Sequence, residues 1–368
     1  MNDEAVATER PTALLPGQQD HEAEDCPVFD VQNLTKHFRL RGGPLGGKRA
    51  YVQAVDRISF SVSKGETLGI VGESGCGKST TARLLMRLIE PDEGTMLLDG
   101  QAVGGVNSIS IRQLRHQVQM VFQDSYASLN PRHTATEEVS FGLVAQGVAR
   151  SEAQRRANDM LDLVGLDPRV FADRYPHELS GGQRQRVNIA RALAIDPRVL
   201  ILDEAVSALD KSIEAQVLNL LVDIKQRLEL TYIFISHDLN VVKFISDRVL
   251  VMYLGKVVEI GPVEKIYESA GHPYTRALIA SRLSMDPRRR LDAAPVAGDL
   301  PSPIDPPSGC RFRTRCPIAE TVCELHEPPL GVIAGDRRHV AACHALSMAS
   351  GHSLAQASSG QTFSHSEV

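Results

Sequence analysis

Apolar runs alternate with amphipathic stretches from Val28 to about Lys265. The runs Thr67–Val71, Val199–Leu202 and Thr231–Ser236 are almost continuously apolar, so they predict strands that are buried on both faces. Between Lys211 and Glu229 the apolar residues recur at helical spacing, namely Ile213, Val217, Leu220, Leu221, Ile224 and Leu228. Strands that alternate with helices in this way predict a mainly parallel α/β sheet.

Local start, stop and loop signals supplement this pattern. Ser151 followed by Gln154 is typical of the start of a helix, and Gly165 is typical of its end. The Gly-rich stretch Arg41–Arg49 predicts a loop between two early strands. After Lys265 the chain becomes rich in Pro and Gly, which predicts a loop-like C-terminal region.

Composition and charge narrow the class of protein. The 368 residues are 42% hydrophobic and carry a formal net charge of −5, as expected of a globular protein with room for two domains. The first 25 residues hold seven acidic residues against Arg10, so the remainder is close to neutral and lacks the basic stripe of a nucleic-acid-binding domain. This segment also lacks the apolar core of a secretory signal, and no apolar run reaches the ~18–20 residues that span a bilayer. We expect a protein that stays in the cytosol and binds no nucleic acid.

A phosphate-binding pattern follows the first buried strand. Residues 72–79 read Gly-Glu-Ser-Gly-Cys-Gly-Lys-Ser and fit the P-loop, with a predicted helix at Thr80–Leu88 behind them. Glycines let backbone N–H groups turn toward a β-phosphate, and the helix N-terminus adds partial positive charge. Lys78 would supply a charge to the β/γ oxygens, and Ser79 a hydroxyl to Mg²⁺. The alternative is a plain glycine-rich turn, which the strand and helix on either side disfavour.

We expect the whole P-loop to contact the nucleotide. The expected residues are Gly72, Glu73, Ser74, Gly75, Cys76, Gly77, Lys78, Ser79 and Thr80. Cys76 is expected to serve as a small residue in the loop and not as a reactive thiol, because no flanking residue supports thiolate chemistry.

The strand at Val199–Leu202 ends in two carboxylates that complete such a site. Asp203 at the C-terminal end of the strand can hold the Mg²⁺ shell, and Glu204 is placed to polarise a water in line with the γ-phosphate. The alternative is an ordinary strand that ends in acidic turn residues. The P-loop upstream favours the catalytic interpretation.

The interval between Lys78 and Asp203 contains Leu179-Ser-Gly-Gly-Gln183, and at this point the chain resembles the ATP-binding cassette (ABC) family. Ser180, Gly181 and Gly182 would open a helix and form a second anion-binding terminus, which one subunit does not need for its own γ-phosphate. The resemblance implies that these residues and Gln183 contact the nucleotide of the opposite subunit, so that two cassettes close over two ATP molecules. It also implies a P-loop NTPase fold, with a RecA-like core, a β-subdomain and a helical subdomain at about 124–190.

Four further residues follow the order of the family, and the resemblance implies their roles. Gln123 would contact Mg²⁺ and the transmembrane partner, Asp210 would couple the two ATP sites, and His237 would sense the γ-phosphate. The expected catalytic residues are Glu204, His237, Lys78 and Gln123. Phe38 resembles the aromatic residue that stacks on adenine, with a core phenylalanine as the alternative.

Within the family, longer stretches resemble the ATPases of oligopeptide and dipeptide importers. These stretches are Phe122–Arg132, Gly271–Leu278, Gly298–Pro303 and Pro307–Pro317. The resemblance implies a sibling ATPase, two membrane permeases and an extracytoplasmic solute-binding protein as partners, at the cytoplasmic face of the inner membrane. Importers for nickel or opines are an alternative, and a soluble ABC ATPase acting on nucleic acid is a more distant one.

The match to the family has departures at three positions. Ser125 and Ala205 stand where proline is usual, and Lys211 stands where an apolar residue is usual. None removes a catalytic side chain, but Lys211 lies beside Asp210 and puts the equivalence of the two ATP sites in doubt.

The resulting division of the chain has four parts. We expect a disordered acidic tail at 1–27, the ABC ATPase domain at 28–265, the importer-type C-terminal region at 266–346 and a disordered tail at 347–368.

Four cysteines fall in the C-terminal region, at positions 310, 316, 323 and 343. Their spacing lacks the Cys-x2-Cys pairs of most zinc sites, and disulfides are disfavoured in the cytosol. Four thiolates could hold an iron–sulfur cluster or a tetrahedral metal, or they could be free thiols in a loop. The family resemblance favours a 4Fe–4S cluster on Cys310, Cys316, Cys323 and Cys343.

Overall fold

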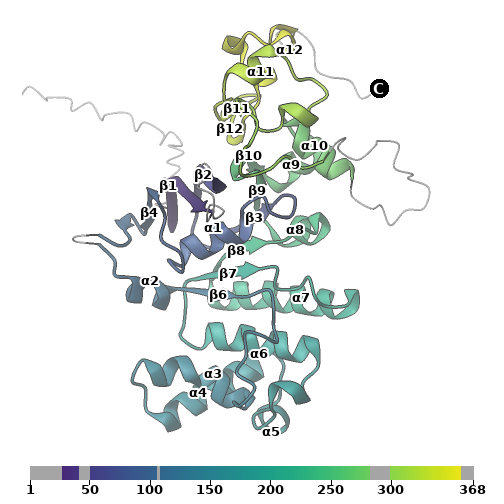
Figure 1. Ribbon diagram of the computed structural model, residues 1–368. Helices are drawn as coiled ribbons and strands as arrows, with labels where there is room; N and C mark the ends of the chain where they lie inside the picture. Colours follow the sequence, from purple (N-terminus) through teal and green to yellow (C-terminus); the bar gives the residue numbers. More distant parts are fainter. Residues whose placement is uncertain (1–26, 41–49, 106–107, 282–298, 358–368) are drawn as a thin grey trace, which may run out of the picture.

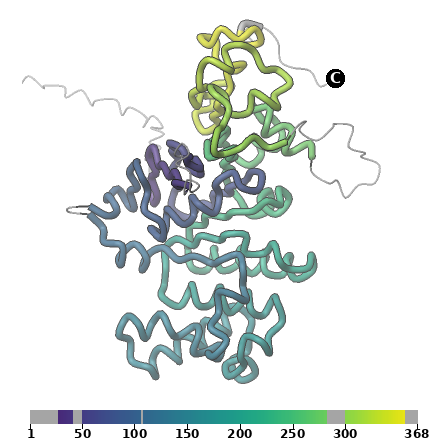
Figure 2. Tube along the Cα trace, viewed as in Figure 1, coloured from purple at the N-terminus to yellow at the C-terminus, as the bar shows by residue number. Residues whose placement is uncertain are grey.

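The computed structural model describes residues 27–40, 50–105, 108–281 and 299–357 (Figure 1). The predicted acidic tail, except Pro27, and the predicted loop at Arg41–Arg49 lie outside the described residues. The helices α3 to α6 gather at one end of the molecule and the C-terminal region lies at the other, as the chain trace in Figure 2 also shows.

An eight-stranded sheet forms the centre of the fold. In spatial order its strands are β11 (Gly331–Ile333), β12 (Asp336–Ala341), β10 (Lys256–Pro262), β9 (Arg248–Tyr253), β3 (Thr67–Val71), β8 (Thr231–Ile235), β7 (Val199–Asp203) and β6 (Val118–Val121). The five strands from β9 to β6 are parallel, and β10, β12 and β11 extend the sheet in antiparallel fashion. The three predicted strands are the parallel neighbours β3, β8 and β7, so the prediction of a mainly parallel α/β sheet is confirmed.

The central strands are apolar throughout because each of them faces two cores. In β7, Leu200 and Leu202 belong to the core under the long helices, while Val199 and Ile201 belong to the core under α1 and the smaller sheet. All five residues of β3, β7 and β8 are buried. A strand covered on both faces has no position where a polar side chain could reach water.

A four-stranded antiparallel sheet covers one side of the second core. Its strands, in spatial order, are β2 (Tyr51–Val62), β1 (Phe29–Arg39), β4 (Glu93–Leu98) and β5 (Gln101–Ala102). Figure 1 shows β1, β2 and β4 beside α1, on the side of the large sheet away from α7.

The helices divide between the two ends and the two faces of the large sheet. They are α1 (Lys78–Leu85), α2 (Ile111–Gln117), α3 (Ala135–Ala145), α4 (Arg150–Leu163), α5 (Pro168–Phe171), α6 (Gly181–Leu193), α7 (Lys211–Leu228), α8 (Leu239–Ile245), α9 (Val263–Glu268), α10 (Pro273–Ala280), α11 (Thr321–Leu325) and α12 (Ser353–Ala357). Short 3-10 turns lie at Pro176–Glu178, Arg313–Arg315, His344–Leu346 and Met348–Ser350. No helix among the described residues has both the length and the apolar character needed to cross a membrane.

Two local predictions differ from the structure. Helix α4 begins at Arg150 after Ala149, and not at Ser151, because packing of Ala153, Ala157 and Leu161 sets its register without a side-chain cap. The tail predicted to be disordered from Ser347 is ordered as far as Ala357. The ring of His352 is 1% exposed and hydrogen bonds the Ile318 carbonyl at 2.9 Å, which anchors this segment.

The C-terminal region is joined to the eight-stranded sheet and does not stand apart from it. Strand β12 pairs with β10 through Glu259 and Ile260, so the sheet crosses the predicted boundary at residue 265. The carboxylate of Glu259, fully buried, accepts hydrogen bonds from the Gly271 and His272 N–H groups and contacts Nε2 of His339 at 2.7 Å. This network fixes α10 and β12 to β10 of the eight-stranded sheet.

Candidate active site

The predicted P-loop opens onto a cleft of about 650 Å³ at the carboxyl ends of β3, β7 and β8. Its lining combines the glycine-rich loop, the start of α1, strands of the smaller sheet and three polar side chains. The lining residues are Phe38, Val52, Ala54, Ser74, Gly75, Gly77, Lys78, Ser79, Thr80, Gln123, Glu204 and His237. Seven of the twelve are P-loop or carboxylate residues that the sequence pattern itself predicts.

The P-loop needs glycines, because its backbone adopts positive φ angles and approaches other backbone atoms too closely for a side chain to fit. Gly72 and Gly77 have φ of 150° and 110°. A Cβ on Gly72 would lie 2.2 Å from the Met252 carbonyl oxygen, and one on Gly77 would lie 2.2 Å from the Ala54 carbonyl oxygen. Gly77 also begins α1 without a side-chain cap, so the first N–H groups of the helix remain free of side-chain acceptors. Such a terminus attracts an anion.

Lys78 is the cation at the base of the cleft. Its side chain is buried, and Nζ donates to the carbonyl oxygens of Gly72 at 2.8 Å and Glu73 at 3.0 Å. The Cys76 thiol is fully buried beside it, and burial raises the pKa of that thiol. Cys76 therefore packs inside the loop, and unlike its predicted role as a nucleotide contact it does not line the cleft.

Ser79 and Asp203 form a pair of hard oxygen ligands beside the lysine. The Ser79 hydroxyl donates to Asp203 Oδ1 at 3.0 Å. Asp203 ends β7 and is buried, and this burial raises the pKa of its carboxyl group. Hydroxyl and carboxylate oxygens are ligands that Mg²⁺ prefers, so this pair suits a Mg²⁺ ion bound to phosphate.

Glu204 lies where β7, β6 and β8 end, and it contacts two of the three other predicted catalytic side chains, Gln123 and His237. Gln123 Nε2 donates to Glu204 Oε2 at 2.8 Å, and His237 Nδ1 lies 3.4 Å from the same oxygen. The backbone of Glu204 has φ of 49°, which non-glycine residues adopt mainly at functional positions and tight turns. The structure thus brings Lys78, Gln123, Glu204 and His237 to one cleft.

Phe38 on β1 also lines the cleft. Its ring is 36% exposed, and Lys36 Nζ lies 5.7 Å from the ring centroid. The sequence did not predict its neighbours Val52 and Ala54, which reach the cleft because β2 pairs with β1. A half-exposed ring in a cleft is suited to stacking on a base, unlike the core phenylalanine considered as the alternative.

The signature residues lie outside this cleft. Ser180 caps α6, where its hydroxyl accepts from the Gln183 N–H at 3.3 Å and the Gln183 side chain accepts from the Ser180 N–H at 2.9 Å. Gly182 allows close packing with α7, because a Cβ there would lie 2.5 Å from the Ile213 side chain. None of Ser180, Gly181, Gly182 and Gln183 lines the cleft of their own chain.

Asp210 caps the neighbouring helix α7 and also lies outside the cleft. Its carboxylate accepts from the Ile213 N–H at 3.0 Å, and this bond and others lower the pKa of the group. The unusual Lys211 that follows it donates to Glu214 and Asp238, both at 2.9 Å. Lys211 therefore links the start of α7 to the residue after His237.

The four C-terminal cysteines gather in one part of the C-terminal region. Burial raises the pKa of Cys310 to about 12, and the neighbouring Cys323, Cys343 and Cys316 thiols add to that rise. Burial also raises the pKa of Cys343 to about 11. In the described part of the chain, no three His, Cys, Asp or Glu side chains are close enough to hold a metal ion as they stand. The thiols are near one another but not in the compact geometry of a tetrahedral site.

Two residues that the sequence did not single out contact the P-loop from the C-terminal region. Arg315 forms an ion pair with Glu73 at 2.9 Å, and the Tyr274 hydroxyl accepts from the Glu73 N–H at 2.9 Å. The sequence indicates only the stretches that contain them, Gly271–Leu278 and Pro307–Pro317, through their resemblance to importer ATPases. No periodicity or spacing signal connects residue 315 with residue 73.

Comparison with protein families gives two matches on this chain. Residues 55–207 match the family described as ABC transporter, and residues 258–323 match the family described as oligopeptide/dipeptide transporter, C-terminal region. The first match contains the P-loop, Gln123, the signature and both carboxylates, and the second contains Tyr274 and Arg315.

Individual proteins resemble the chain over most of its length. A probable peptide ABC transporter ATP-binding protein of Sinorhizobium fredii is 49% identical over 86% of this chain and 89% of its own length. The oligopeptide transport ATP-binding protein AppF of Bacillus subtilis is 46% identical over 87% of this chain and 98% of its own. Among solved structures, a dimeric ATP-binding cassette in a post-hydrolysis state, bound to ADP and Pi, is 30% identical. It aligns with a TM-score of 0.55 over 64% of this chain and 98% of that one.

Proposed function

This chain belongs to the ABC transporter ATP-binding proteins, and from that premise we propose that it hydrolyses ATP to drive the uptake of peptides through a membrane importer. The single observation that carries the proposal is the cleft that joins the P-loop to Glu204, Gln123 and His237. The match of residues 258–323 supports a peptide as the cargo, because that family is described by oligopeptide and dipeptide transport. An importer for nickel or opines would use a similar ATPase and is the alternative.

Binding of ATP would use the two ends of the cleft. The base would stack on Phe38, and the phosphates would replace the carbonyl oxygens of Gly72 and Glu73 as partners of Lys78. Free N–H groups at the start of α1 would hold the β-phosphate. Ser79, Asp203 and Gln123 would hold Mg²⁺, which supplies charge neutralisation at the β- and γ-phosphates when it is bound.

Hydrolysis would depend on the group of side chains around Glu204. Glu204 would orient a water and accept its proton, because it is the carboxylate at the γ-phosphate end of the cleft. Gln123 would hold the Glu204 carboxylate in place through the 2.8 Å hydrogen bond. His237 would contact the γ-phosphate, since its side chain lies beside Glu204 and is more than half exposed to the cleft.

The catalytic unit would be a dimer. Ser180 and the helix start behind it lie outside their own cleft, so they are available to the nucleotide of a second cassette. The similar solved structure is a dimer of cassettes, which supports the same arrangement here. The second cassette would be a sibling ATPase subunit, and Asp210 beside the signature would couple the two sites.

Coupling to the membrane would use the segment after Gln123. A groove of about 500 Å³ lies there, lined in part by Phe122, Asp124, Phe141 and Arg191. The rings of Phe122 and Phe141 are 38% and 61% exposed, which suits a surface that a partner covers. Two permease subunits would bind there and place the protein at the cytoplasmic face of the inner membrane, with a solute-binding protein on the other side.

The four cysteines would hold a 4Fe–4S cluster in this proposal. Four thiols that lie near one another in a buried region are a suitable donor set for iron–sulfur chemistry. The cluster would order the loops of the C-terminal region. No step of ATP hydrolysis is assigned to it.

The experiment that tests the ATP site compares two lysine variants. We expect Lys78→Ala to lose ATP binding in isothermal titration, because it removes the buried cation at the phosphate end of the cleft. Lys64→Ala changes an exposed lysine outside the cleft and serves as the matched control. Wild-type ATP affinity in Lys78→Ala would contradict the proposed site.

The experiment that tests the cargo uses the whole transporter. The chain would be reconstituted in vesicles with the permeases, sibling ATPase and solute-binding protein encoded beside it. We expect ATP-dependent uptake of labelled di- or oligopeptides. Uptake of nickel or an opine without peptide uptake would replace the peptide with the alternative cargo and leave the ATPase assignment intact.

A further inference from the structure

The loop that carries Cys310 and Cys316 contacts two segments that border the nucleotide cleft. Arg311 contacts β2 and Arg315 contacts the P-loop, whereas Arg313 between them contacts only the C-terminal region. Arg313 donates to the Ser308 carbonyl oxygen at 3.0 Å and lies 3.7 Å from Glu324. Two alternate arginines of one loop therefore contact two different segments that contribute to the cleft, β2 and the P-loop.

Arg315 acts on the phosphate side. Its Nη1 donates to Glu73 Oε2 at 2.9 Å and its Nη2 to Glu73 Oε1 at 3.1 Å, the two-pronged geometry in which guanidinium and carboxylate bind most strongly. The Arg315 side chain is 7% exposed, so water screens the pair little. A lysine could neutralise Glu73 but could not reproduce both bonds.

Glu73 is held at each of its three polar groups. Its carboxylate binds Arg315, its N–H donates to the Tyr274 hydroxyl and its carbonyl oxygen accepts from Lys78 at 3.0 Å. Two of these three contacts come from the C-terminal region. Because Glu73 directly follows Gly72 at the start of the P-loop, they set the backbone that must cradle phosphate.

The charge of Glu73 gives Arg315 a second effect. An acidic side chain in the P-loop would repel a triphosphate if it were unpaired. Arg315 neutralises it. Loss of the arginine would therefore weaken ATP binding by repulsion as well as by loosening the loop.

Arg311 acts on the other side of the cleft, through β2. Its guanidinium donates to Gln53 Oε1 at 2.6 Å and also contacts Asp56 and the Leu254 carbonyl oxygen. Gln53 and Asp56 lie next to Ala54 and Val55, and Ala54 lines the cleft. Val52 pairs with Phe38 across the two strands. Arg311 thus fixes the strand that positions the aromatic end of the cleft.

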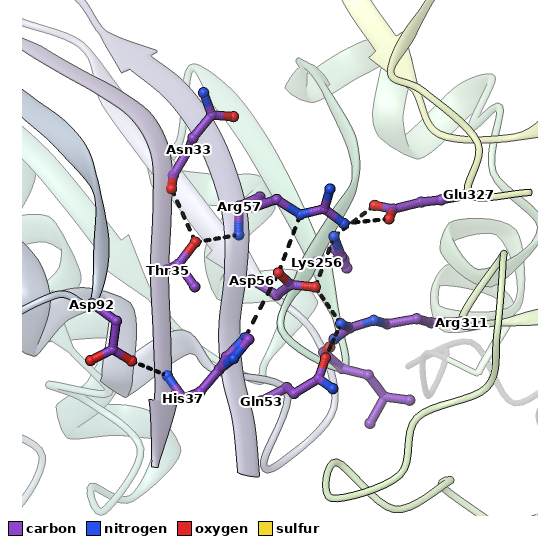
Figure 3. A network of polar contacts seen from close by, with 11 residues as sticks. Asn33, Thr35, His37, Gln53, Asp56, Arg57, Asp92, Lys256, Arg311 and Glu327 are labelled. Atoms are coloured by element: carbon purple, nitrogen blue, oxygen red, sulfur yellow. Dashed lines mark hydrogen bonds and ion pairs between the residues drawn. The ribbon is translucent and has the colours of Figure 1, made fainter. Parts of the chain in front are cut away.

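A wider polar network supports Arg311, as Figure 3 shows. Lys256 Nζ contacts Asp56 at 2.9 Å and Glu327 at 2.6 Å, and Arg57 joins the same two carboxylates. Glu327 and Arg311 belong to the C-terminal region, while Asp56 and Arg57 belong to β2. The network joins that region to β2 through the largely buried pair Arg311–Asp56 and the more exposed pair Arg57–Glu327.

We propose that the segment Cys310–Cys316 is a positioning element for the nucleotide cleft, in which Arg315 holds the P-loop and Arg311 holds the adenine side. The inference rests on the ATP site proposed above and adds a function for the C-terminal region. Neither arginine lines the cleft, so both are positioning residues that act through Glu73 and through Gln53 and Asp56.

The test uses three alanine variants of the full chain, with ATP and AMP affinities measured by titration calorimetry. Arg315→Ala should weaken ATP binding about tenfold and AMP binding less, because Glu73 lies at the phosphates. Arg311→Ala should weaken ATP and AMP binding to a similar extent, about fivefold, because it acts at the base. Arg313→Ala is the matched control and should bind both as the wild type does.

A second-site variant separates positioning from a merely structural effect. Adding Glu73→Gln to Arg315→Ala removes the unpaired carboxylate and should restore most of the ATP affinity. A structural defect in the C-terminal region would not respond to this change. If Arg315→Ala does not fold, Arg315→Lys keeps the charge without the two-pronged bond and should weaken ATP binding about threefold.

Two kinds of result would overturn the inference. One is wild-type ATP affinity in Arg315→Ala, or in folded Arg315→Lys where the alanine variant does not fold. The other is an equal loss in Arg313→Ala, or no rescue by Glu73→Gln. If instead the proposed ATP site were wrong, the wild type and Arg313→Ala would also bind no ATP in the calorimeter. This result is distinct from a failure of the positioning role.

Discussion

Replacing Glu204 by glutamine tests the assignment of the catalytic base. Glutamine has the same shape as glutamate, and its amide oxygen can still accept the hydrogen bond that Gln123 donates at 2.8 Å. The variant loses only the negative charge and the ability to take a proton. Because Glu204 makes no contact with Lys78 or Ser79, the phosphate-binding groups remain as they are.

The size of the effect follows from the role of a positioned base. General-base catalysis contributes about 10²- to 10⁴-fold, which corresponds to about 3–5 kcal/mol of activation free energy. We expect Glu204→Gln to lower the turnover number by ~10²-fold or more. Its affinity for ATP should stay the same or rise slightly, since removing a carboxylate from the cleft reduces repulsion of the triphosphate.

The assay measures steady-state phosphate release by the assembled pair of cassettes and, separately, ATP affinity by calorimetry. Glu229→Gln serves as the control, because Glu229 is exposed at the end of α7 and lies outside the cleft. If Glu204→Gln keeps its steady-state turnover, Glu204 is not the catalytic base. If it loses affinity as well as turnover, the Glu204 carboxylate also takes part in ATP binding and is not only a base.

Three other predictions concern parts of the chain outside the cleft. Ser180→Arg should leave the ATP affinity of the isolated chain unchanged and lower the turnover of the assembled cassettes more than tenfold, since in the proposed dimer Ser180 serves the opposite site; wild-type turnover would refute this. Glu259→Gln should lower the free energy of unfolding at pH 7 by about 3 kcal/mol in urea titrations. Burial alone would raise the pKa of Glu259, but an imidazole, a hydroxyl and two N–H groups lower it. The stabilisation is therefore present above the ordinary pKa of 4.5 and is lost as pH falls through the folded-state value. If Glu259→Gln lost the same free energy of unfolding at pH 3 as at pH 7, this prediction would be contradicted. Anaerobically purified protein should contain iron and sulfide, whereas a stable, colourless, metal-free protein would exclude the cluster.

The sequence predicted the elements whose signals are local. The central strands have no solvent-exposed face, so Val199–Leu202 and the neighbouring strands are apolar throughout. An exposed segment would not show that pattern. The P-loop was predictable for a different reason. Gly72 and Gly77 stand at positions where the backbones of Met252 and Ala54 leave no room for a side chain.

Other features depend on contacts between distant residues, which no local pattern encodes. The order of the tail around His352 comes from a hydrogen bond to Ile318, and its composition alone predicts disorder. The start of α4 follows the packing of Ala153 and Ala157 and not the capping signal at Ser151. The contact between Arg315 and Glu73 joins residues 242 positions apart, so only the fold reveals it.

The two functions of the cleft, affinity and turnover, depend on different parts of the fold. Glu204 and Gln123 follow β7 and β6, which lie toward the helices α3 to α6, whereas Glu73 and Gln53 are held by the C-terminal region at the other end (Figure 1). Changes at Arg315 or Arg311 should therefore act first on ATP affinity, and changes at Ser180 or Glu204 first on turnover. Arg315 and Ser180 share no partner among the described contacts, so their effects on free energy should add. The C-terminal region would then set how readily ATP is loaded, and the helical end would set when the loaded pair hydrolyses it.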